Sequence, residues 1–274
     1  MRYGLALSVS VLVGCTGSAM AGVVVTTTHT HLDTHQADTA NIYVEADKLK
    51  VVSPDTTMIY RADLNRVWAI NAGRRSYVEI TPETMQQMAG QISGAQAQMQ
   101  ARLAQLPPEQ RAQIEALMAS RGLGGAPGAR AGGPPPKPQI AYAKTGNSKT
   151  VGNWRCDFYR KTRNGEQEED VCLAPIGSVG LSAADFQVLE RMSAFIAPIT
   201  SSPVVPRTDY LGWDAMNKAV GFQAVPLDTL NYVAGKPDAE DVVTKIERTM
   251  IPASTFELPP GLTKQDMAGG FGPH

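Results

Sequence analysis

The sequence predicts an α+β protein in which amphipathic helices cover an antiparallel sheet. Residues 42–81 read as consecutive short strands joined by tight turns, and such turns demand antiparallel neighbours. Residues 83–106 and 182–197 carry apolar side chains at steps of three or four, the pattern of amphipathic helices. A sheet with one apolar face must be covered by a second layer, so we expect these helices to cover it.

Alternating apolar and polar residues define the strands of residues 42–81. Turn chemistry at 53–55, 63–65 and 71–74 separates them. Residues 49–52 either continue the first strand past a bulge or form its partner. Residues 23–28 are strongly β-prone and predict a strand before this meander, followed by a polar connection over 36–40.

A helical insert over residues 83–121 interrupts the strands. Thr81 can cap a helix that has Pro82 at its first position. The prolines at 107 and 108 break this helix, and a second one starts at Pro108. Residues 122–138 form a Gly/Pro/Ala-rich linker that cannot pack a core.

A hairpin is predicted around Arg163-Asn164-Gly165. A three-residue turn pairs residue 162 with 166, which sets Arg160 opposite Glu168 and Cys156 opposite Cys172. The cysteine spacing agrees with this register, so we expect a Cys156–Cys172 disulfide.

The remaining chain predicts one more helix and further strands. The helix starts at Ser182 and ends at Pro198. Strands follow at 221–227, 230–233 and 242–247. The prolines and glycine at 259–261 end the fold, and residues 265–274 form a disordered tail.

The first 21 of the 274 residues read as a signal peptide, with an apolar stretch too short to span a bilayer. We favour cleavage between Ala21 and Gly22. The alternative is a bacterial lipobox ending at Cys15, which would anchor the protein to a membrane through a lipid. Both place the protein outside the cytoplasm, where a disulfide is stable. The net charge of −1 and the absence of a basic patch argue against nucleic-acid binding.

One group of side chains could bind a metal ion. His29, His31, Asp33 and His35 lie at alternate positions and would project from one face if the strand continues through them. Imidazole and carboxylate ligands suit Zn, Ni or Cu. The other interpretation is a solvated face of an edge strand.

Enzyme signatures are absent from the sequence: it has no nucleophile elbow, no His-Glu-x-x-His and no Cys-x-x-Cys. We therefore expect a protein that is not an enzyme and has no catalytic residues. The tryptophans and several tyrosines, Tyr60 among them, either line a cavity or form ordinary core.

Several short motifs together resemble a known family. They are the export signal, residues 49–52 with 59–60, residues 77–81, residues 154–159, and the closing 251–261. This set resembles exported bacterial proteins of the domain-of-unknown-function 4412 family, which is similar in fold to the LolA/LolB lipoprotein carriers. The resemblance implies a strongly curved antiparallel half-barrel closed over by helices, a single domain over residues 22–264. It brings no known activity and no site residues.

Three functions remain open. The first is a non-enzymatic cell-envelope protein that binds an apolar ligand such as a lipid or a lipoprotein acyl chain. The second is a periplasmic metal-binding protein that uses the histidine strand, and the third is an interaction module whose helical insert docks a partner helix. For the first, flexible methionines on a covering helix leave room for an acyl chain. The predicted pocket residues are Met85, Met88, Ile92, Met99, Trp68, Phe186 and Leu189.

Overall fold

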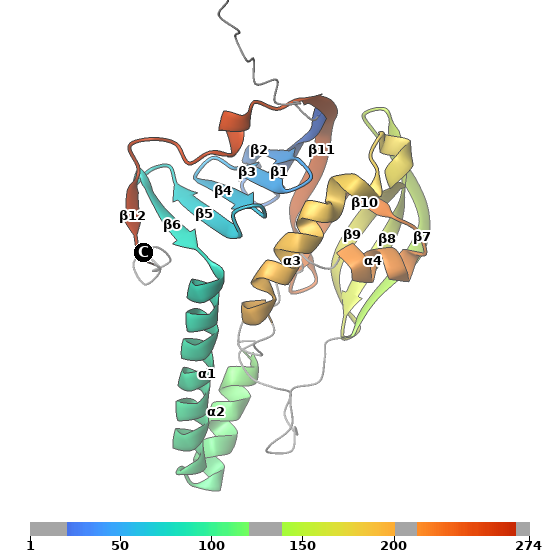
Figure 1. Cartoon of the computed structure of the whole chain (residues 1–274). Coiled ribbons are helices and arrows are strands. Elements are labelled where there is room, and N and C mark those ends of the chain that lie inside the picture. The colour runs from blue at the N-terminus through green and yellow to red at the C-terminus, as the bar shows by residue number, and fades with distance from the viewer. Residues whose placement is uncertain (1–20, 121–138, 201–212, 267–274) are drawn as a thin grey trace, which may run out of the picture.

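The computed structural model describes residues 21–120, 139–200 and 213–266. They form one large, mostly antiparallel, unclosed sheet with helices packed on it, in agreement with the predicted α+β class (Figure 1). The strand order is β12-β6-β5-β4-β3-β2-β1-β11-β10-β9-β8-β7. The two end strands lie at opposite sides of the molecule, and β12 alone is paired in parallel. Residues 1–20 of the predicted signal peptide, Cys15 among them, and the predicted linker 122–138 lie outside the described residues.

The first half of the sheet is the predicted meander plus the strand before it. Its strands are β1 (Ala21–His31), β2 (Ala37–Val44), β3 (Lys48–Val52), β4 (Thr56–Arg61), β5 (Arg66–Asn71) and β6 (Ser76–Ile80). Each pairs antiparallel with the next. Residues 49–52 are therefore a partner strand and not a continuation.

The second half contains longer strands. They are β7 (Ile140–Val151), β8 (Trp154–Arg163), β9 (Glu166–Pro175), β10 (Ala224–Val233), β11 (Lys236–Met250) and β12 (Thr263–Gln265). β1 pairs with β11, so strands more than 200 residues apart in sequence join the two halves.

The helices lie between these strands in sequence. They are α1 (Pro82–Ala104), α2 (Pro108–Ser120), α3 (Gln187–Thr200) and α4 (Trp213–Val220), with short 3-10 turns η1 (Ile176–Val179), η2 (Ala183–Phe186) and η3 (Ala253–Phe256). The predicted cap at Thr81 is confirmed: its hydroxyl accepts from the Thr84 backbone N–H, and Thr84 returns the interaction. Figure 1 shows α1 and α2 extending away from the sheet.

Several predicted boundaries are wrong. The supposed connection at 36–40 mostly belongs to β2, and the two strands expected at 221–233 are the single strand β10. The strand at 242–247 is the middle of the longer β11. α3 continues through Pro198 to Thr200, and β12 extends the fold past residue 261 to Gln265, the first residue of the predicted tail.

The 164–165 hairpin forms with a different register from the predicted one. Asn164 and Gly165 have φ values of 52° and 88°, which makes a two-residue turn with Arg163 opposite Glu166. Arg160 therefore pairs with Asp170 and not with Glu168, and Cys172 lies opposite Phe158. The Cys156–Cys172 disulfide is nevertheless present, with a Cα–Cα distance of 5.3 Å.

Apolar side chains pack on both faces of the sheet, since adjacent strand residues point to opposite faces. On one face, Tyr60 and Cys172 belong to a core cluster that includes Val188 and Met192 of α3. On the other face, η3 covers the first half and α4 covers the second half. Phe256 of η3 packs with Ile59 and Trp68, and Met216 of α4 packs with Tyr159 and Leu173.

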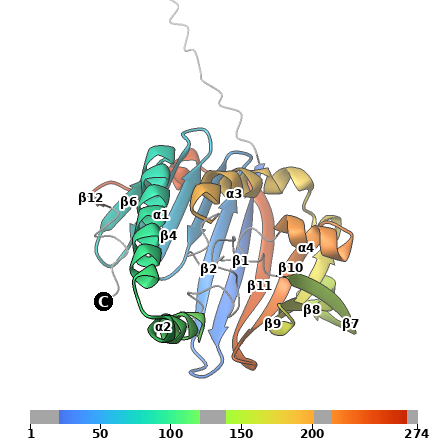
Figure 2. The same cartoon turned by 90° about the horizontal axis from the view of Figure 1, so that it is seen from below.

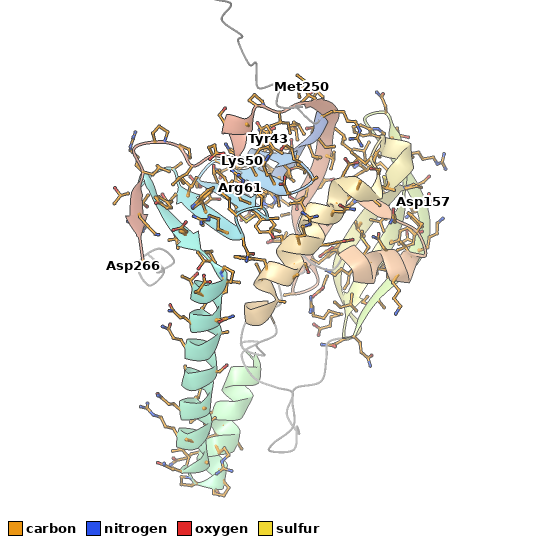
Figure 3. The ribbon with its side chains drawn as sticks, viewed as in Figure 1. Tyr43, Lys50, Arg61, Asp157, Met250 and Asp266 are labelled. Carbon is orange, nitrogen blue, oxygen red and sulfur yellow. A yellow bond between two sulfur atoms is a disulfide. The ribbon has the colours of Figure 1, made fainter. Side chains whose placement is uncertain are left out.

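Charged side chains also hold distant segments together. Arg61 on β4, labelled in Figure 3, is buried and donates to Asp63 at 2.8 and 2.6 Å. It also donates to Glu257 at 2.8 Å. These ion pairs tie the centre of the meander to the segment that follows η3, and they raise the pKa of the Arg61 guanidinium.

Candidate functional site

A pocket of about 560 Å³ opens between β4, the first turns of α1, and α3. This volume lies within the range of roughly 300–1,000 Å³ that is typical of small-molecule sites. The residues that line it are Tyr60, Ala62, Asn65, Pro82, Met85, Gln86, Arg191, Ala194 and Phe195. Figure 2 shows α1 and α3 over this half of the sheet, near β4 and β2.

The inner part of the pocket is apolar. Tyr60 and Met85 are buried, at 2% and 3% exposure. The Tyr60 ring lies 5.6 Å from the Phe195 ring, centroid to centroid, in a tilted arrangement that favours aromatic contact. These three side chains come from β4, α1 and α3, so the pocket depends on all three elements.

The rim of the pocket is polar and solvent-exposed. Asn65 lies in the β4–β5 turn, Gln86 on α1 and Arg191 on α3, and all three are exposed. Burial raises the pKa of the Tyr60 phenol, and the electrostatic influence of the Arg191 guanidinium opposes part of that rise. An apolar interior with a few polar groups at the mouth suits an amphiphile.

Local sequence explains why these elements meet. The capping box at Thr81 and Thr84 fixes the start of α1 directly after β6, which brings Met85 over the sheet. A second capping box, Ser182 with Asp185, starts the turn that leads into α3. Burial raises the pKa of the Asp185 carboxyl, but hydrogen bonds from Arg248 and Ser182 outweigh this, and the net pKa is lowered.

The structure brings together only part of the predicted pocket. Met85 lines it, while Met88 is half-buried on the next turn of α1 outside the lining. Phe186 and Leu189 pack against the core cluster under α3. Met99 is exposed on the outer part of α1. The side chain of Ile92 lies outside what the structure describes.

Trp68 was predicted on the same pocket and lies on the opposite face of the sheet. It pairs with Ile59 across β4 and β5 and packs near Phe256. Strand alternation explains why Trp68 and Tyr60 lie on different faces of the sheet. Trp68 is paired with Ile59, and Tyr60 is the next residue along β4, so its side chain points to the opposite face. Arg191 and Ala194 are the main lining residues that were not predicted. The sequence does not indicate which face of α3 meets α1.

The histidine strand ends before the predicted metal ligands align. β1 stops at His31, Asp33 lies in a turn, and His35 has a φ of 55°, so the four side chains do not share one strand face. His29 Nδ1 lies 2.7 Å from Asp241 Oδ1, and its ring contacts that of His31 edge-on at 4.6 Å.

The described residues contain no group of three or more His, Cys, Asp or Glu side chains placed to hold a metal ion. The described residues therefore do not favour metal binding by this strand. In the same described ranges, no helix is both long and apolar enough to cross a membrane.

Comparisons with known proteins leave the chain unassigned. No protein-family model matches it, and no curated protein does. Among solved structures, PNGF-II in a C2 space group is similar over 91% of this chain and 32% of its own, with 8% identity and a TM-score of 0.38. The MucA/MucB complex of Pseudomonas aeruginosa is similar over 88% of this chain and 56% of its own, with 9% identity and a TM-score of 0.37.

A structure of MucB is similar over 89% of this chain and 60% of its own, with 9% identity and a TM-score of 0.35. This chain thus spans less than two thirds of the length of each of these proteins. Likenesses of this strength do not assign it to a fold family.

Proposed function

We propose that this is an exported, non-enzymatic protein that binds the acyl chain of an apolar ligand in the pocket between β4, α1 and α3. The observation that carries the proposal is the pocket itself, with the buried side chains of Tyr60 and Met85 at its base and an open, polar rim. The ligand's chain would lie against Tyr60, Met85 and Phe195.

The surrounding architecture supports this proposal. α1 and α3 contact each other over the unclosed sheet, and the pocket lies between these two helices and β4. The buried Cys156–Cys172 disulfide suits an oxidising compartment. Processing after Ala21, or lipid attachment at Cys15, would then decide whether the exported protein is free or anchored.

The test is saturable binding of an environment-sensitive fluorescent fatty acid to the full-length mature protein. Ala194→Trp places a bulky ring in the pocket from its exposed rim and should abolish binding without unfolding the protein. Gln187→Trp adds the same ring to an exposed position of α3 outside the lining, and should leave binding unchanged. Equal binding by both variants, or no saturable binding by the unmodified protein, would refute the proposal.

A second candidate function is an interaction module on the α1–α2 hairpin. Met99 of α1 and Ile114 of α2 are exposed at 37% each, on the part of the hairpin that extends from the sheet. Arg111 of α2 donates to the Leu103 and Ala104 carbonyls at 3.0 and 2.9 Å, which caps the end of α1 and holds the hairpin together. Removal of residues 90–120, which leaves the pocket-lining residues Pro82, Met85 and Gln86 in place, would test this candidate: a partner protein bound by the full chain should be lost while the Cys156–Cys172 disulfide still forms.

A further inference from the structure

The lining of the pocket carries a positive charge and no negative one. Among the described residues that line it, Arg191 is the one with a formal charge, and no Asp or Glu is present. Asn65 and Gln86 add uncharged amide groups at the same rim. A ligand headgroup at this opening therefore meets one cation and several hydrogen-bonding groups.

Arg191 differs from two arginines on the strands. Arg66 pairs with Glu79, and Arg248 with Asp185. Within the described ranges, no hydrogen bond or ion pair occupies the Arg191 guanidinium. Arg191 lines the pocket together with Tyr60 and Phe195, so its guanidinium is available to an anion at this opening.

We propose that the pocket takes a single-chain amphiphile with an anionic headgroup, and that Arg191 determines this specificity. The inference rests on the acyl-chain function proposed above. A guanidinium presents two parallel N–H donors that match a carboxylate or phosphate. The chain would extend inward from Arg191 past Phe195 toward Tyr60 and Met85.

The size and charge of the site narrow the class of ligand. A pocket of about 560 Å³ matches one chain with a small headgroup better than a two-chain phospholipid. The diacylglyceryl end of a lipoprotein is uncharged and would leave Arg191 without a partner. A fatty-acid carboxylate satisfies both the apolar interior and the cation at the rim.

The experiment compares two ligands with the same chain, dodecanoate and dodecanol, as competitors of an environment-sensitive apolar dye bound to the full mature protein. We expect dodecanoate to compete better, and the difference to shrink as salt is added. Arg191→Gln should weaken dodecanoate about 3- to 10-fold, because it removes an exposed charge-assisted hydrogen bond, and should leave dodecanol unchanged. Arg155→Gln, the same change at an exposed position of β8, should affect neither ligand.

The outcomes separate this inference from the function on which it rests. Equal competition by both ligands, unaffected by Arg191→Gln, would overturn the headgroup inference while the acyl-chain function stands. Binding of neither ligand would overturn both. Binding to vesicles of an acidic phospholipid without competition by dodecanoate would overturn the single-chain assignment.

Discussion

Lys149 on the edge strand β7 forms an ion pair with Asp228 on β10, although β8 and β9 lie between these strands in the sheet. The Lys149 ammonium also lies 3.6 Å from Glu240 on β11. The sheet must bend sharply at this end for these side chains to meet. A smaller pocket of about 250 Å³ lies beside the ion pair.

The two partners of this ion pair should respond differently to mutation. Asp228 is 2% exposed, whereas the Lys149 side chain is 44% exposed and can be hydrated alone. Lys149→Met leaves a buried, unpaired carboxylate, and we expect a loss of about 1–2 kcal/mol after allowance for solvent screening. Asp228→Asn should lower the free energy of unfolding by less. The double variant should have about the same free energy of unfolding as Asp228→Asn. Urea unfolding of all three measures this, and equal losses from the two single variants would contradict it.

The same ion pair should make the free energy of unfolding depend on pH. The hydrogen bond to Asp228 raises the pKa of the Lys149 ammonium above its ordinary value of 10.5. Its contribution to stability is therefore complete below pH 10.5 and is lost as pH rises through the higher folded pKa. The stability difference between the wild type and Lys149→Met should shrink in that alkaline range.

Acid should weaken the ion pairs around Arg61. A hydrogen bond from Arg61 lowers the pKa of the Asp63 carboxyl below its ordinary value of 3.8. The stabilisation is thus present above pH 3.8 and is lost as pH falls through the lowered folded pKa. Asp63→Asn should cost about 1 kcal/mol at neutral pH and progressively less in acid. Asp55→Asn, in an exposed turn, is the control and should change the free energy of unfolding by less than about 0.5 kcal/mol.

Loss of the Cys156–Cys172 disulfide should destabilise the second half of the sheet. The two cysteines are 16 residues apart, and a loop of about this size corresponds to about 3 kcal/mol in the chain-entropy model. Replacing both with Ala should lower the free energy of unfolding by that amount. Alkylation without reductant provides the check on the bond: reaction at both thiols in the folded, untreated protein would show that it does not form.

Local signals in the sequence predicted the local structure well. The tight turns of the meander, the Thr81 cap and the break before Pro108 each depend on a few adjacent residues, and all are present. The hairpin register failed because Asn164 can adopt positive φ as well as Gly165, which shortens the turn to two residues. The disulfide was therefore predicted correctly from a register that is wrong.

Long-range relationships were not predictable in the same way. The pairing of β1 with β11 and the contact of Lys149 with Asp228 join residues that no local pattern connects. The pocket also depends on residues that are far apart in the sequence. Tyr60 was a candidate cavity residue, but its partnership with Phe195 and Arg191 depends on how α3 crosses the sheet. An amphipathic pattern identifies the apolar side of a helix and does not identify the strand it crosses.

Lys50 offers a test in which removing a charge should stabilise the fold. It lies on β3, labelled in Figure 3, directly between Tyr43 and Ile59 of the neighbouring strands. Burial lowers the pKa of its ammonium, and among the described residues no hydrogen bond or ion pair compensates the charge. The folded state thus carries a penalty at neutral pH that is relieved as pH rises through the lowered pKa.

Lys50→Met keeps an unbranched apolar chain against Tyr43 and Ile59 while it removes the charge. We expect the free energy of unfolding at neutral pH to rise by about 0.5–1 kcal/mol, because apolar contact replaces a poorly hydrated ammonium. Lys236→Met, at an exposed position beside the β10–β11 turn, should stay within about 0.5 kcal/mol of the wild type. The gain from Lys50→Met should also diminish at alkaline pH, where Lys50 of the wild type is neutral. A loss of stability at neutral pH would mean that the Lys50 ammonium is stabilised by its surroundings, contrary to the lowered pKa.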